Sequence, residues 1–551
     1  MKTHRKIHIL LAISGLTLTT ALGYAQANGP LSVLWQKTYG PGKNINGVGM
    51  AAPYDFVQTP DGGFLIAGYA YGSTNDMRTA PVCPATDFWV IKIDAQGIRQ
   101  WDKSCGGEAS WGPGSLAVRI FLDPDGGFLL AGHTTSDARC CQTAPRHGLI
   151  DAWAVRYDAS GNKLWDQTYL PDGHDFFWAF DFERTADGGY LGCGLGGVSP
   201  NGGYYGIVKF DAQGQQLWTK KIGCLDPVVF SEALRILETA DGGFIVAGAS
   251  GLTACDDKTS PYFGGYDPNN ALLGSDFWVV RCDAQQNKLW DRSYGGRNGD
   301  LALDIYALAD GGFMVFGTSA SPPETDPTKG TKTSPLYGLH DYWVVRIDAQ
   351  GNQLWDRSYG GTSDDVCTHA EPMPDGGWLL SGTSMSPPSA DKTSPRFGSA
   401  DIWIVRIDED GNKLWEQSFG GNGLEGKQWR GFVPPQFMRE RIKHTPDGGF
   451  LLTASSESQV SGVKTAPLIS QGDFWVLKLG PEPPSLSGAV TPDGKFQLRL
   501  IGPPEFKYAI QGSADLVAWT TLADDVEIPT GKVFWTDPDT AGHRFYRAVR
   551  K

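Results

Sequence analysis

DYWVVRIDAQGNQLWDRSYG, residues 341–360, contains the spacing that decides the fold. Asp341 opens an Asp-x-Trp segment, and a second Trp, Trp355, follows that Asp after 14 residues. A spacing that recurs along the chain indicates one supersecondary unit per repeat, stacked on its neighbours. The other occurrences are Asp87–Trp101, Asp151–Trp165, Tyr204–Trp218 (with Tyr in the Asp position), Asp276–Trp290 and Asp401–Trp415.

The two ends of the repeat array complete one further unit. Asp473 begins a seventh Asp-x-Trp segment, but no Trp follows it at the same spacing. Near the front of the chain, Trp35 matches the second Trp and has no Asp-x-Trp before it. The pattern therefore predicts a ring closed by its own first strand, 31–40, added to three inner strands from 436–479. Pairing of the first and last strands removes two sheet edges that would otherwise invite aggregation.

Each unit also contains a tight hairpin. Asp-Gly-Gly followed by an aromatic residue occurs seven times, and its glycines supply the positive φ that such turns need. A short strand precedes this turn, and an apolar strand, the Asp-x-Trp strand and the strand with the second Trp follow it. Seven repeats of four short antiparallel strands predict an all-β chain, a seven-bladed β-propeller with Trp rings packed between blades. The hairpins begin at Asp61, Asp125, Asp187, Asp241, Asp310, Asp375 and Asp447.

The predicted closure resembles that of WD-repeat propellers. The turn Asp-Ala-x-Gly-x-x-x-Trp resembles the tryptophan-docking turn of quinoprotein-type propellers, although it is one residue shorter between Asp and Gly. The whole repeat, with W-x-x-x-[YF]-G-G, K-T-[SA]-P and D-[FY]-W-V-V-[RK]-[IL]-D, looks most like that of large secreted bacterial repeat proteins of undefined activity. The resemblance implies the fold and carries over no catalytic residue.

Composition shifts divide the chain into four parts. Residues 1–27 look like a secretory signal, with a basic start, an apolar core and an Ala-x-Ala cleavage site ending at Ala27. Residues 28–480 form the predicted propeller, and 481–485 form a Pro-rich linker. Residues 486–551 alternate apolar and polar positions and resemble a fibronectin-like β-sandwich. We expect a secreted, periplasmic or cell-surface protein without a membrane span.

The charge of the chain excludes one class of partner. Removal of the predicted signal, which holds three basic residues and no acid, lowers the formal net charge from −14 to −17. An acidic chain lacks the positive surface that nucleic acid binding needs. We expect a monomer that binds a glycan or a protein.

The nine cysteines leave an odd thiol in a monomer. Cys83, Cys140, Cys141 and Cys255 fall in predicted loops and are the disulfide candidates. The adjacent pair Cys140–Cys141 resembles the cysteine ring of some quinoprotein dehydrogenases, but those propellers have eight blades. We expect no cofactor. Calcium is the alternative, with Asp300, Asp304, Asp364 and Asp365 as oxygen donors.

Loop lengths predict where a ligand binds. The Asp-Gly-Gly hairpins and the 14-residue turns hardly vary, whereas the connections on the opposite face differ widely. Blade three lacks the Thr-[Ser/Ala]-Pro segment found in the other six blades. Blade four has an insertion near 265–273, and blade seven has a long connection before Asp447. A deletion beside an insertion predicts a groove over blades three and four, with neutral loop drift as the alternative.

Acids and aromatic residues in the long loops suit a sugar ring, because aromatic faces stack on C–H groups while carboxylates bind hydroxyls. We therefore expect a noncatalytic binding or adhesion protein that recognises a surface glycan or a protein. A polysaccharide hydrolase or lyase, using two of these acids, is the second hypothesis, and a structural envelope component is the third. The candidate binding residues are Glu108, Trp111, Asp172, His174, Asp175, Trp178, Asp300, Asp364, Asp365 and Trp429, and Asp304, His369 and Glu425 lie in the same predicted region.

Overall fold

The computed structural model describes most of the chain. The described residues are Leu11–Ala12, 31–83, 85–109, 114–198, 203–224, 231–255, 257–264, 274–426, 440–480, 485–490, 496–501, 507–528, 532–538 and 545–550. Every regular element in this part is a β-strand, so it contains no helix long and apolar enough to cross a membrane. The insertion near 265–273, Trp111 and Trp429 lie outside the described residues.

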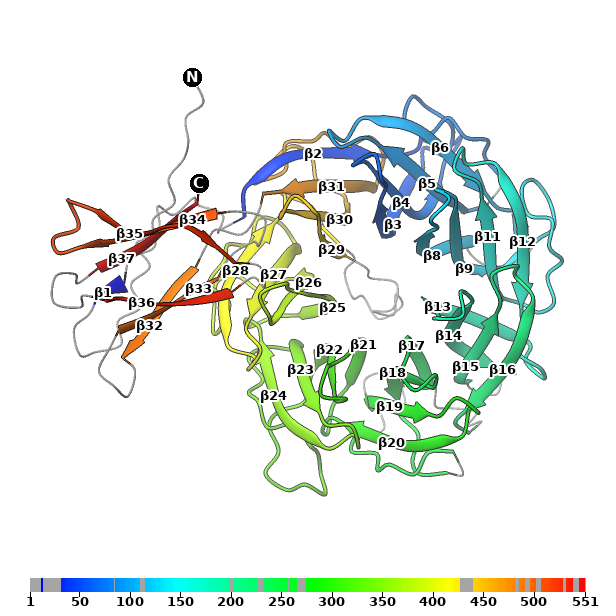
Figure 1. Cartoon of the computed structure of the whole chain (residues 1–551). Coiled ribbons are helices and arrows are strands. Elements are labelled where there is room, and N and C mark those ends of the chain that lie inside the picture. Colours follow the sequence, from blue (N-terminus) through cyan, green and yellow to red (C-terminus); the bar gives the residue numbers. More distant parts are fainter. Residues whose placement is uncertain are drawn as a thin grey trace.

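Between Val33 and Leu479 the described strands form seven four-stranded antiparallel sheets, arranged around a central space (Figure 1). This is a β-propeller-like fold. Sheet 1 consists of β3 (Met50–Gln58), β4 (Phe64–Tyr71), β5 (Asp87–Ile93) and β6 (Arg99–Cys105). Sheet 2 consists of β8 (Ser115–Leu122), β9 (Phe128–Thr134), β11 (Asp151–Tyr157) and β12 (Lys163–Tyr169). Sheet 3 consists of β13 (Phe176–Arg184), β14 (Tyr190–Gly197), β15 (Gly203–Phe210) and β16 (Gln216–Ile222).

Sheets 4 to 6 repeat this order from the innermost strand outward. Sheet 4 consists of β17 (Ser231–Glu238), β18 (Phe244–Ser250), β19 (Asp276–Cys282) and β20 (Lys288–Tyr294). Sheet 5 consists of β21 (Asp300–Ala307), β22 (Phe313–Ser319), β23 (Asp341–Ile347) and β24 (Gln353–Tyr359). Sheet 6 consists of β25 (Asp365–Pro372), β26 (Trp378–Ser384), β27 (Asp401–Ile407) and β28 (Lys413–Phe419).

Sheet 7 combines the two ends of the repeat array. Its strands are β29 (Arg441–His444), β30 (Phe450–Ser456), β31 (Asp473–Leu479) and, outermost, β2 (Val33–Tyr39). β2 runs antiparallel to β31, with Thr38 opposite Trp475. The strand that begins the array therefore lies beside the last Asp-x-Trp strand.

The outermost strand of a sheet holds the turn between the third and fourth strands of the next sheet. Trp35 donates a hydrogen bond from Nε1 to the carbonyl oxygen of Ala95 (3.1 Å), and the Tyr39 hydroxyl donates to that of Gly97 (2.6 Å). Gly97 has a φ of +76°, and a Cβ there would lie 2.8 Å from the Trp35 ring. This contact explains the constant 14-residue spacing, because the turn must reach the preceding sheet. The residue at the Gly97 position has a positive φ and is a glycine in the other turns, except that sheet 4 has Gln286 there, with a φ of +68°. The same pair of bonds joins sheet 4 to sheet 5, from Trp290 to Ala349 and from Tyr294 to Gly351.

The Asp-[Phe/Tyr]-Trp strands add a second contact between sheets. The aromatic residue of one sheet packs on the Trp of the next, and such pairs contribute about 0.5–1.5 kcal/mol beyond the buried area. The ring-centroid distances are 4.4 Å for Phe88–Trp153, 4.5 Å for Tyr205–Trp278, 4.6 Å for Phe277–Trp343, 4.8 Å for Tyr342–Trp403 and 4.9 Å for Phe474–Trp89. The last pair connects sheet 7 to sheet 1.

The Thr-[Ser/Ala]-Pro segments bind the residue that follows the second Trp. In sheet 5, the Asp356 carboxylate accepts hydrogen bonds from the N–H and hydroxyl of Thr333 and from Nε1 of Trp343. The preceding Lys332 is buried and donates to the carbonyl oxygen of Ser334 (2.7 Å), and burial lowers its pKa to about 8. In sheet 3, which lacks the segment, Thr219 stands at the acceptor position. Thr79–Asp102, Thr143–Asp166, Thr259–Asp291, Thr393–Glu416 and Thr465–Gln36 are the corresponding pairs.

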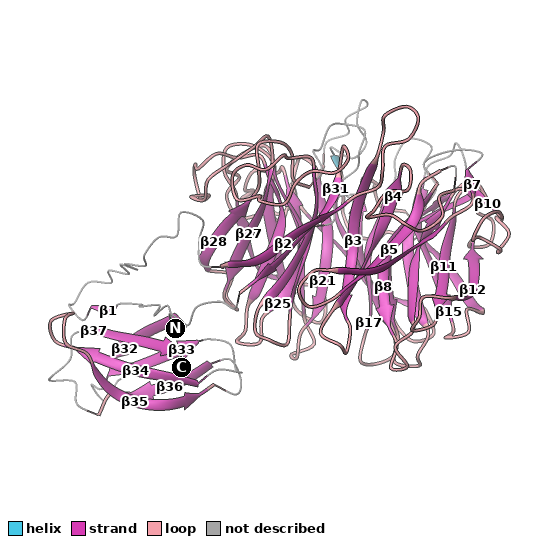
Figure 2. Ribbon diagram, turned by 90° about the horizontal axis from the view of Figure 1, so that it is seen from above, coloured by secondary structure: helices cyan, strands magenta, loops and turns pink. Residues whose placement is uncertain are grey.

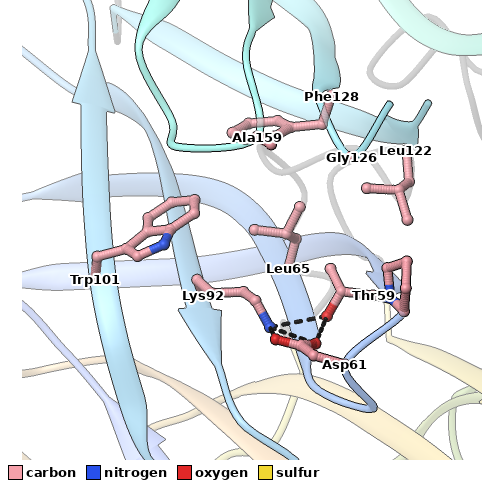
Figure 3. A pocket seen from close by; sticks show the side chains of 10 residues that line it. Thr59, Asp61, Leu65, Lys92, Trp101, Leu122, Gly126, Phe128 and Ala159 are labelled. Atoms are coloured by element: carbon pink, nitrogen blue, oxygen red, sulfur yellow. Dashed lines mark hydrogen bonds and ion pairs between the residues drawn. The ribbon is translucent and has the colours of Figure 1, made fainter. Parts of the chain in front are cut away.

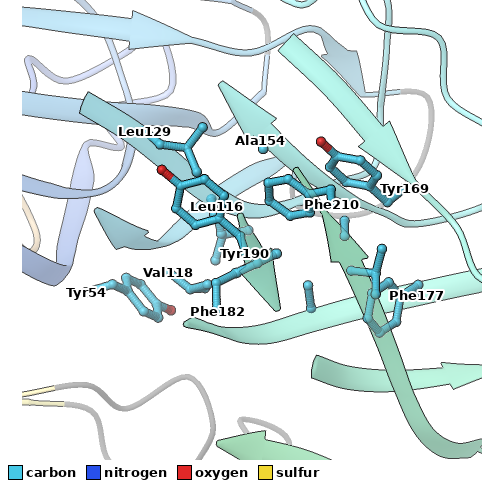
Figure 4. Close-up of a cluster of buried hydrophobic side chains, with 14 of the residues drawn as sticks. Tyr54, Leu116, Val118, Leu129, Ala154, Tyr169, Phe177, Phe182, Tyr190 and Phe210 are labelled. Carbon is cyan, nitrogen blue, oxygen red and sulfur yellow. The ribbon is translucent and has the colours of Figure 1, made fainter. Parts of the chain in front are cut away.

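Apolar side chains fill the space between neighbouring sheets. Figure 4 shows one such cluster, in which Tyr54, Leu116 and Phe182 come from sheets 1, 2 and 3. Within it the ring of Phe210 stacks on Tyr169 at 4.5 Å and on Tyr190 at 5.2 Å. Both faces of each sheet are thus buried, which accounts for the continuous apolar runs in the second and third strands.

The connections separate the two faces of the ring. The Asp-Gly-Gly hairpins and the 14-residue turns lie on one face, which we call the short-turn face. The connections from second to third strands, and from one sheet to the next, lie on the other, the long-loop face (Figure 2). β7 (Glu108–Ala109) and β10 (Ser136–Asp137) pair on the long-loop face, between sheets 1 and 2.

After Leu479 the described strands form two further sheets around one core. One contains β32 (Ser485–Val490), β33 (Phe496–Ile501) and β36 (Lys532–Thr536), and the other contains β34 (Lys507–Ser513), β35 (Thr520–Glu527), β37 (Phe545–Arg550) and β1 (Leu11–Ala12). Leu498, Tyr508, Ile510 and Tyr546 are buried in the shared core. β1 falls within the predicted signal segment.

Two disulfides are present, and they are compatible with an extracellular protein. They join Cys105 to Cys141 and Cys224 to Cys255. Of the four predicted candidates, Cys141 and Cys255 are paired, while Cys83 and Cys140 are thiols.

Candidate functional site

The innermost strands bring one charged or titratable side chain per sheet to the central space. In β3, β8, β13, β17, β21 and β25 the pairing with the second strand shifts by one residue, as in a β-bulge, immediately before this side chain. All seven side chains are at most 9% exposed. We call them the central ring: Asp55, Arg119, Asp181, Arg235, Asp304, His369 and Arg441.

Contacts run around the whole central ring. Its members alternate between acid and base, except that His369 stands beside Arg441. Because seven is an odd number, alternation must fail once. The closest distances are 3.9 Å for Asp55–Arg119, 3.4 Å for Arg119–Asp181, 2.7 Å for Asp181–Arg235, 3.1 Å for Arg235–Asp304, 2.9 Å for Asp304–His369, 3.5 Å for His369–Arg441 and 3.7 Å for Arg441–Asp55.

The charges of the central ring stabilise one another. Burial alone would raise the pKa of Asp304, but the hydrogen bond and charge of His369 and the charge of Arg235 hold that pKa below its ordinary value. Burial also opposes ionisation of Asp55, and Lys443, with Arg441 and Arg119, holds its pKa below the usual range. These two carboxylates are therefore ionised, and each is paired with neighbouring basic side chains.

The residue just before each member of the central ring is buried as well. In sheets 1 to 5 this residue is apolar, and Phe180, Leu234 and Leu303 pack with Leu195 and Val366 in one cluster. In sheets 6 and 7 it is Thr368 and Glu440, and the hydroxyl of Thr368 donates a hydrogen bond to the Glu440 carboxylate (3.0 Å). The central ring thus presents buried, paired charges rather than acids open to a ligand. The apolar residues of sheets 1 to 5 are Tyr54, Val118, Phe180, Leu234 and Leu303.

Arg235 tests the energetic role of the central ring. Its replacement by Met leaves Asp181 and Asp304 buried without their nearest arginine, and we expect the free energy of unfolding to fall by about 3–5 kcal/mol. Urea denaturation followed by tryptophan fluorescence measures this. Arg139→Met is the control, because it removes a surface pair with Glu108 whose side chains are 69% and 46% exposed, an interaction of about 0–1 kcal/mol. Equal losses in the two variants would contradict the role of the central ring.

Glu232 is a buried acid outside the central ring. It lies on β17, three residues before Arg235, where the other described sheets have Ala52, Leu116, Trp178, Leu301 and Val366. The side chain is 5% exposed, and its Oε2 has no hydrogen-bond partner within the described residues. Burial raises the pKa of Glu232 to about 7. A perturbed, unpaired carboxyl of this kind is a candidate functional group.

Glu232→Gln should change how stability depends on pH. The folded pKa of about 7 exceeds the ordinary 4.5, so the folded chain holds a proton that the unfolded chain releases between these values. The contribution of Glu232 to stability therefore rises as the pH falls from 8 to 5. We expect the stability difference between variant and parent to change by about 3 kcal/mol over this range, in favour of the variant at pH 8.

Urea denaturation of both proteins at pH 8 and pH 5 measures this difference. Glu238→Gln, at the half-buried end of the same strand, supplies the comparison. A difference between Glu232→Gln and the parent that stays the same at both pH values would contradict the assignment.

The predicted binding residues near sheets 1 to 3 differ in their exposure. Asp172 and Asp175 are exposed on the long-loop face, and Trp178 is half-buried there. Glu108 lies at the junction of sheets 1 and 2 and pairs with Arg139. His174 is buried, its Nδ1 lies 2.8 Å from the carbonyl oxygen of Pro171, and burial lowers its pKa to about 4.

Three acids of the long-loop face are buried and accept hydrogen bonds from neighbouring loops: Asp300, Asp365 and Glu425. Asp300 accepts hydrogen bonds from the N–H of Gly296 (2.9 Å) and the hydroxyl of Ser321 (2.8 Å). One sheet further round, Asp365 accepts the equivalent bonds from Gly361 and Ser386. In the next sheet, Glu425 accepts from the N–H of Gly421 and from the hydroxyl of Ser456. All three are buried, and burial raises the pKa of Asp300 and Asp365 to about 6. Asp364 lies 2.6 Å from Nδ1 of His340.

The oxygen donors proposed for calcium are engaged elsewhere. Asp304 binds His369 and Arg235, and Asp365 binds its own loop, so these carboxylates do not converge. Within the described residues no three His, Cys, Asp or Glu side chains gather in a metal-binding group.

A pocket of about 240 Å³ opens on the short-turn face between sheets 1 and 2 (Figure 3). Trp101 and Phe128 form its apolar wall. At its polar end Lys92 donates to Asp61 (2.8 Å) and to the hydroxyl of Thr59 (2.8 Å). This pair is a repeated structural contact and not a feature of the pocket, because the Asp of every Asp-Gly-Gly hairpin pairs with the basic residue of the third strand. The other pairs are Asp125–Arg156, Asp187–Lys209, Asp241–Arg281, Asp310–Arg346, Asp375–Arg406 and Asp447–Lys478.

Comparison with known proteins gives distant likenesses. No family model matches the chain. It is 27% identical over 208 residues to the regulatory protein FlaEY of Caulobacter vibrioides, a match that covers 35% of this chain and 21% of that relative.

Three solved structures to which the fold is similar have TM-scores below 0.4. A protein of unknown function from Dyadobacter fermentans has a TM-score of 0.38 at 12% identity and covers 82% of this chain and 100% of its own. Domains 1–2 of Drosophila Semaphorin 1a have a TM-score of 0.28 at 10% identity, covering 78% and 85%. A glycoside hydrolase has a TM-score of 0.23 at 9% identity, covering 78% and 93%.

Proposed function

We propose that the chain is a secreted, noncatalytic recognition protein that binds a surface glycan or a protein through its long-loop face. It acts as a monomeric seven-bladed β-propeller closed by its first strand and followed by a fibronectin-like module. The observation that carries this proposal is the closed central ring. Because its acids are paired and buried, the side chains left to meet a ligand are those of the loops.

Two contacts support closure by the first strand. Gln36, on β2, accepts hydrogen bonds from Nε1 of Trp475 (3.0 Å) and from the N–H of Thr465 (2.9 Å). Trp35 and Tyr39, on the same strand, hold the turn of sheet 1. β2 thus joins the last sheet to the first.

Deletion of residues 28–41 tests the closure. We expect a large fall in the melting temperature or aggregation, because sheet 7 would lose its outer strand and sheet 1 its docking contacts. Differential scanning calorimetry and light scattering measure the two effects. A truncated protein that melts like the parent would refute the closure.

Loop side chains on a rigid frame support recognition. Asp172 and Asp175 are exposed near the half-buried indole of Trp178, a combination that suits the hydroxyls and the C–H face of a sugar. A protein ligand would meet the same loops.

A binding assay with a polysaccharide panel tests the proposal. The full chain is scored for retention on each glycan and for new reducing or unsaturated ends. We expect retention without new ends, and a weakening of about tenfold in Asp172→Asn/Asp175→Asn through loss of charge-assisted hydrogen bonds. Asp410→Asn, an exposed acid on the short-turn face, is the matched control and should bind like the parent. Retention equal in all three proteins would contradict binding through the long-loop face.

One observation favours a second function, polysaccharide cleavage. A buried carboxyl with a pKa near neutrality can act as a general acid toward a glycosidic oxygen, and Glu232 has this property. New chain ends in the same assay, abolished by Glu232→Gln, would establish cleavage and overturn the noncatalytic proposal.

A further inference from the structure

Four cysteines gather where sheets 1 and 2 meet on the long-loop face. Cys105 ends β6 and forms a disulfide with Cys141. Cys140 precedes Cys141 in the loop after β10, and Cys83 lies in the loop between β4 and β5. One strand and two loops therefore contribute sulfur atoms to one place.

The contacts bring the two thiols of this group together. The Sγ of Cys83 donates to the carbonyl oxygen of Gly106 (3.7 Å), and the N–H of Gln142 donates to the same oxygen (3.1 Å). Cys140 is the neighbouring thiol that raises the pKa of Cys83. The Cys105–Cys141 disulfide and the bond from Gln142 thus hold the loop of Cys140 beside Cys83.

The two thiols differ in accessibility. Cys83 is 6% exposed, whereas Cys140 is exposed. Cys140 has a φ of +54°, a backbone conformation that non-glycine residues seldom adopt. Burial raises the pKa of Cys83 well above its ordinary value, and Cys140 raises it further. A small oxidant in solution therefore meets Cys140 first, and Cys83 is placed to react in a second step.

We propose that Cys83 and Cys140 are an oxidisable pair that closes a further disulfide when a low-molecular-weight disulfide is present. The Cys140 thiolate attacks the small disulfide, forming a mixed disulfide and expelling one thiolate. Cys83 loses its proton and attacks the sulfur of Cys140, forming the Cys83–Cys140 bond and expelling the second thiolate. Two electrons pass from the protein to the small disulfide, and the two protons leave with the two small thiols.

The bond would act on the loops that carry a predicted ligand contact. The loop of Cys140 follows β10, whose partner strand β7 contains Glu108, and Arg139 of that loop pairs with Glu108. Cys105–Cys141 already ties this loop to β6. A second bond would tie it to the loop of Cys83 as well and restrict this part of the long-loop face.

Thiol counting and peptide mapping test the proposal. The full chain is incubated with oxidised glutathione at pH 8, then denatured and alkylated. We expect the free thiols to fall from five to three, with a linked peptide that contains Cys83 and Cys140. If the bond has already formed in the purified protein, the count starts at three and mapping finds the same peptide. The oxidised form should also melt at a higher temperature.

Three variants identify the pair. Cys140→Ser, a change at an exposed position, should lose no thiol to an internal bond. Cys83→Ser should stop at a mixed disulfide of Cys140 with glutathione. Cys282→Ser removes a buried thiol of sheet 4 and should lose two thiols like the parent. Glutathione that remains on Cys140 of the parent while Cys83 is alkylated would overturn the proposal, as would a bond from Cys83 to Cys105 or Cys141.

Discussion

The rest of the structure depends on one contact, in which the Trp and Tyr of each outer strand bind the turn of the next sheet. A single four-stranded sheet cannot bury both of its faces, so its stability comes from its two neighbours. The Trp and Tyr of the outer strand fix where the next sheet lies, and the Asp-[Phe/Tyr]-Trp aromatics fill the space between. Within sheet 7, β2 and β31 bring together Gln36 and Trp475, which are 439 residues apart. This last contact therefore forms only when the whole ring has been built, and contacts of such high sequence separation slow folding.

Features with a fixed residue type at a fixed spacing could be predicted from the sequence. The four-strand units, the Asp-Gly-Gly hairpins and the Trp-bearing strands belong to this class, because each depends on local turn geometry or on one large ring. The central ring could not be found in this way, since its members are Asp, Arg or His. Their position is nevertheless constant: Asp55, Arg119 and Arg235, like the other members, stand six residues before the Asp of an Asp-Gly-Gly hairpin.

The direction of a side chain separates the predicted binding residues that face solvent from those that are buried. Asp172 and Asp300 both occur near the start of a first strand, and the sequence does not distinguish them. In the structure Asp172 is exposed, whereas Asp300 turns back to bind Gly296 and Ser321. Glu232 is the reverse case, a buried acid whose sequence position indicates exposure. An isolated acid on a strand is typical of a surface residue, and only the apolar residues at the equivalent positions of other sheets indicate that Glu232 is buried.

The alternation of the central ring has a consequence for how such a chain can change in length. Each sheet contributes the charge that its two neighbours lack. Duplication of a single sheet, for instance the one that carries Asp181, would place two buried carboxylates side by side. Loss of the sheet that carries Arg119, Asp181 or Arg235 would bring two like charges together in the same way, whereas loss of the sheet that carries His369 would leave Asp304 beside Arg441. Away from His369, gene duplications that keep the charges paired must therefore add or remove sheets two at a time.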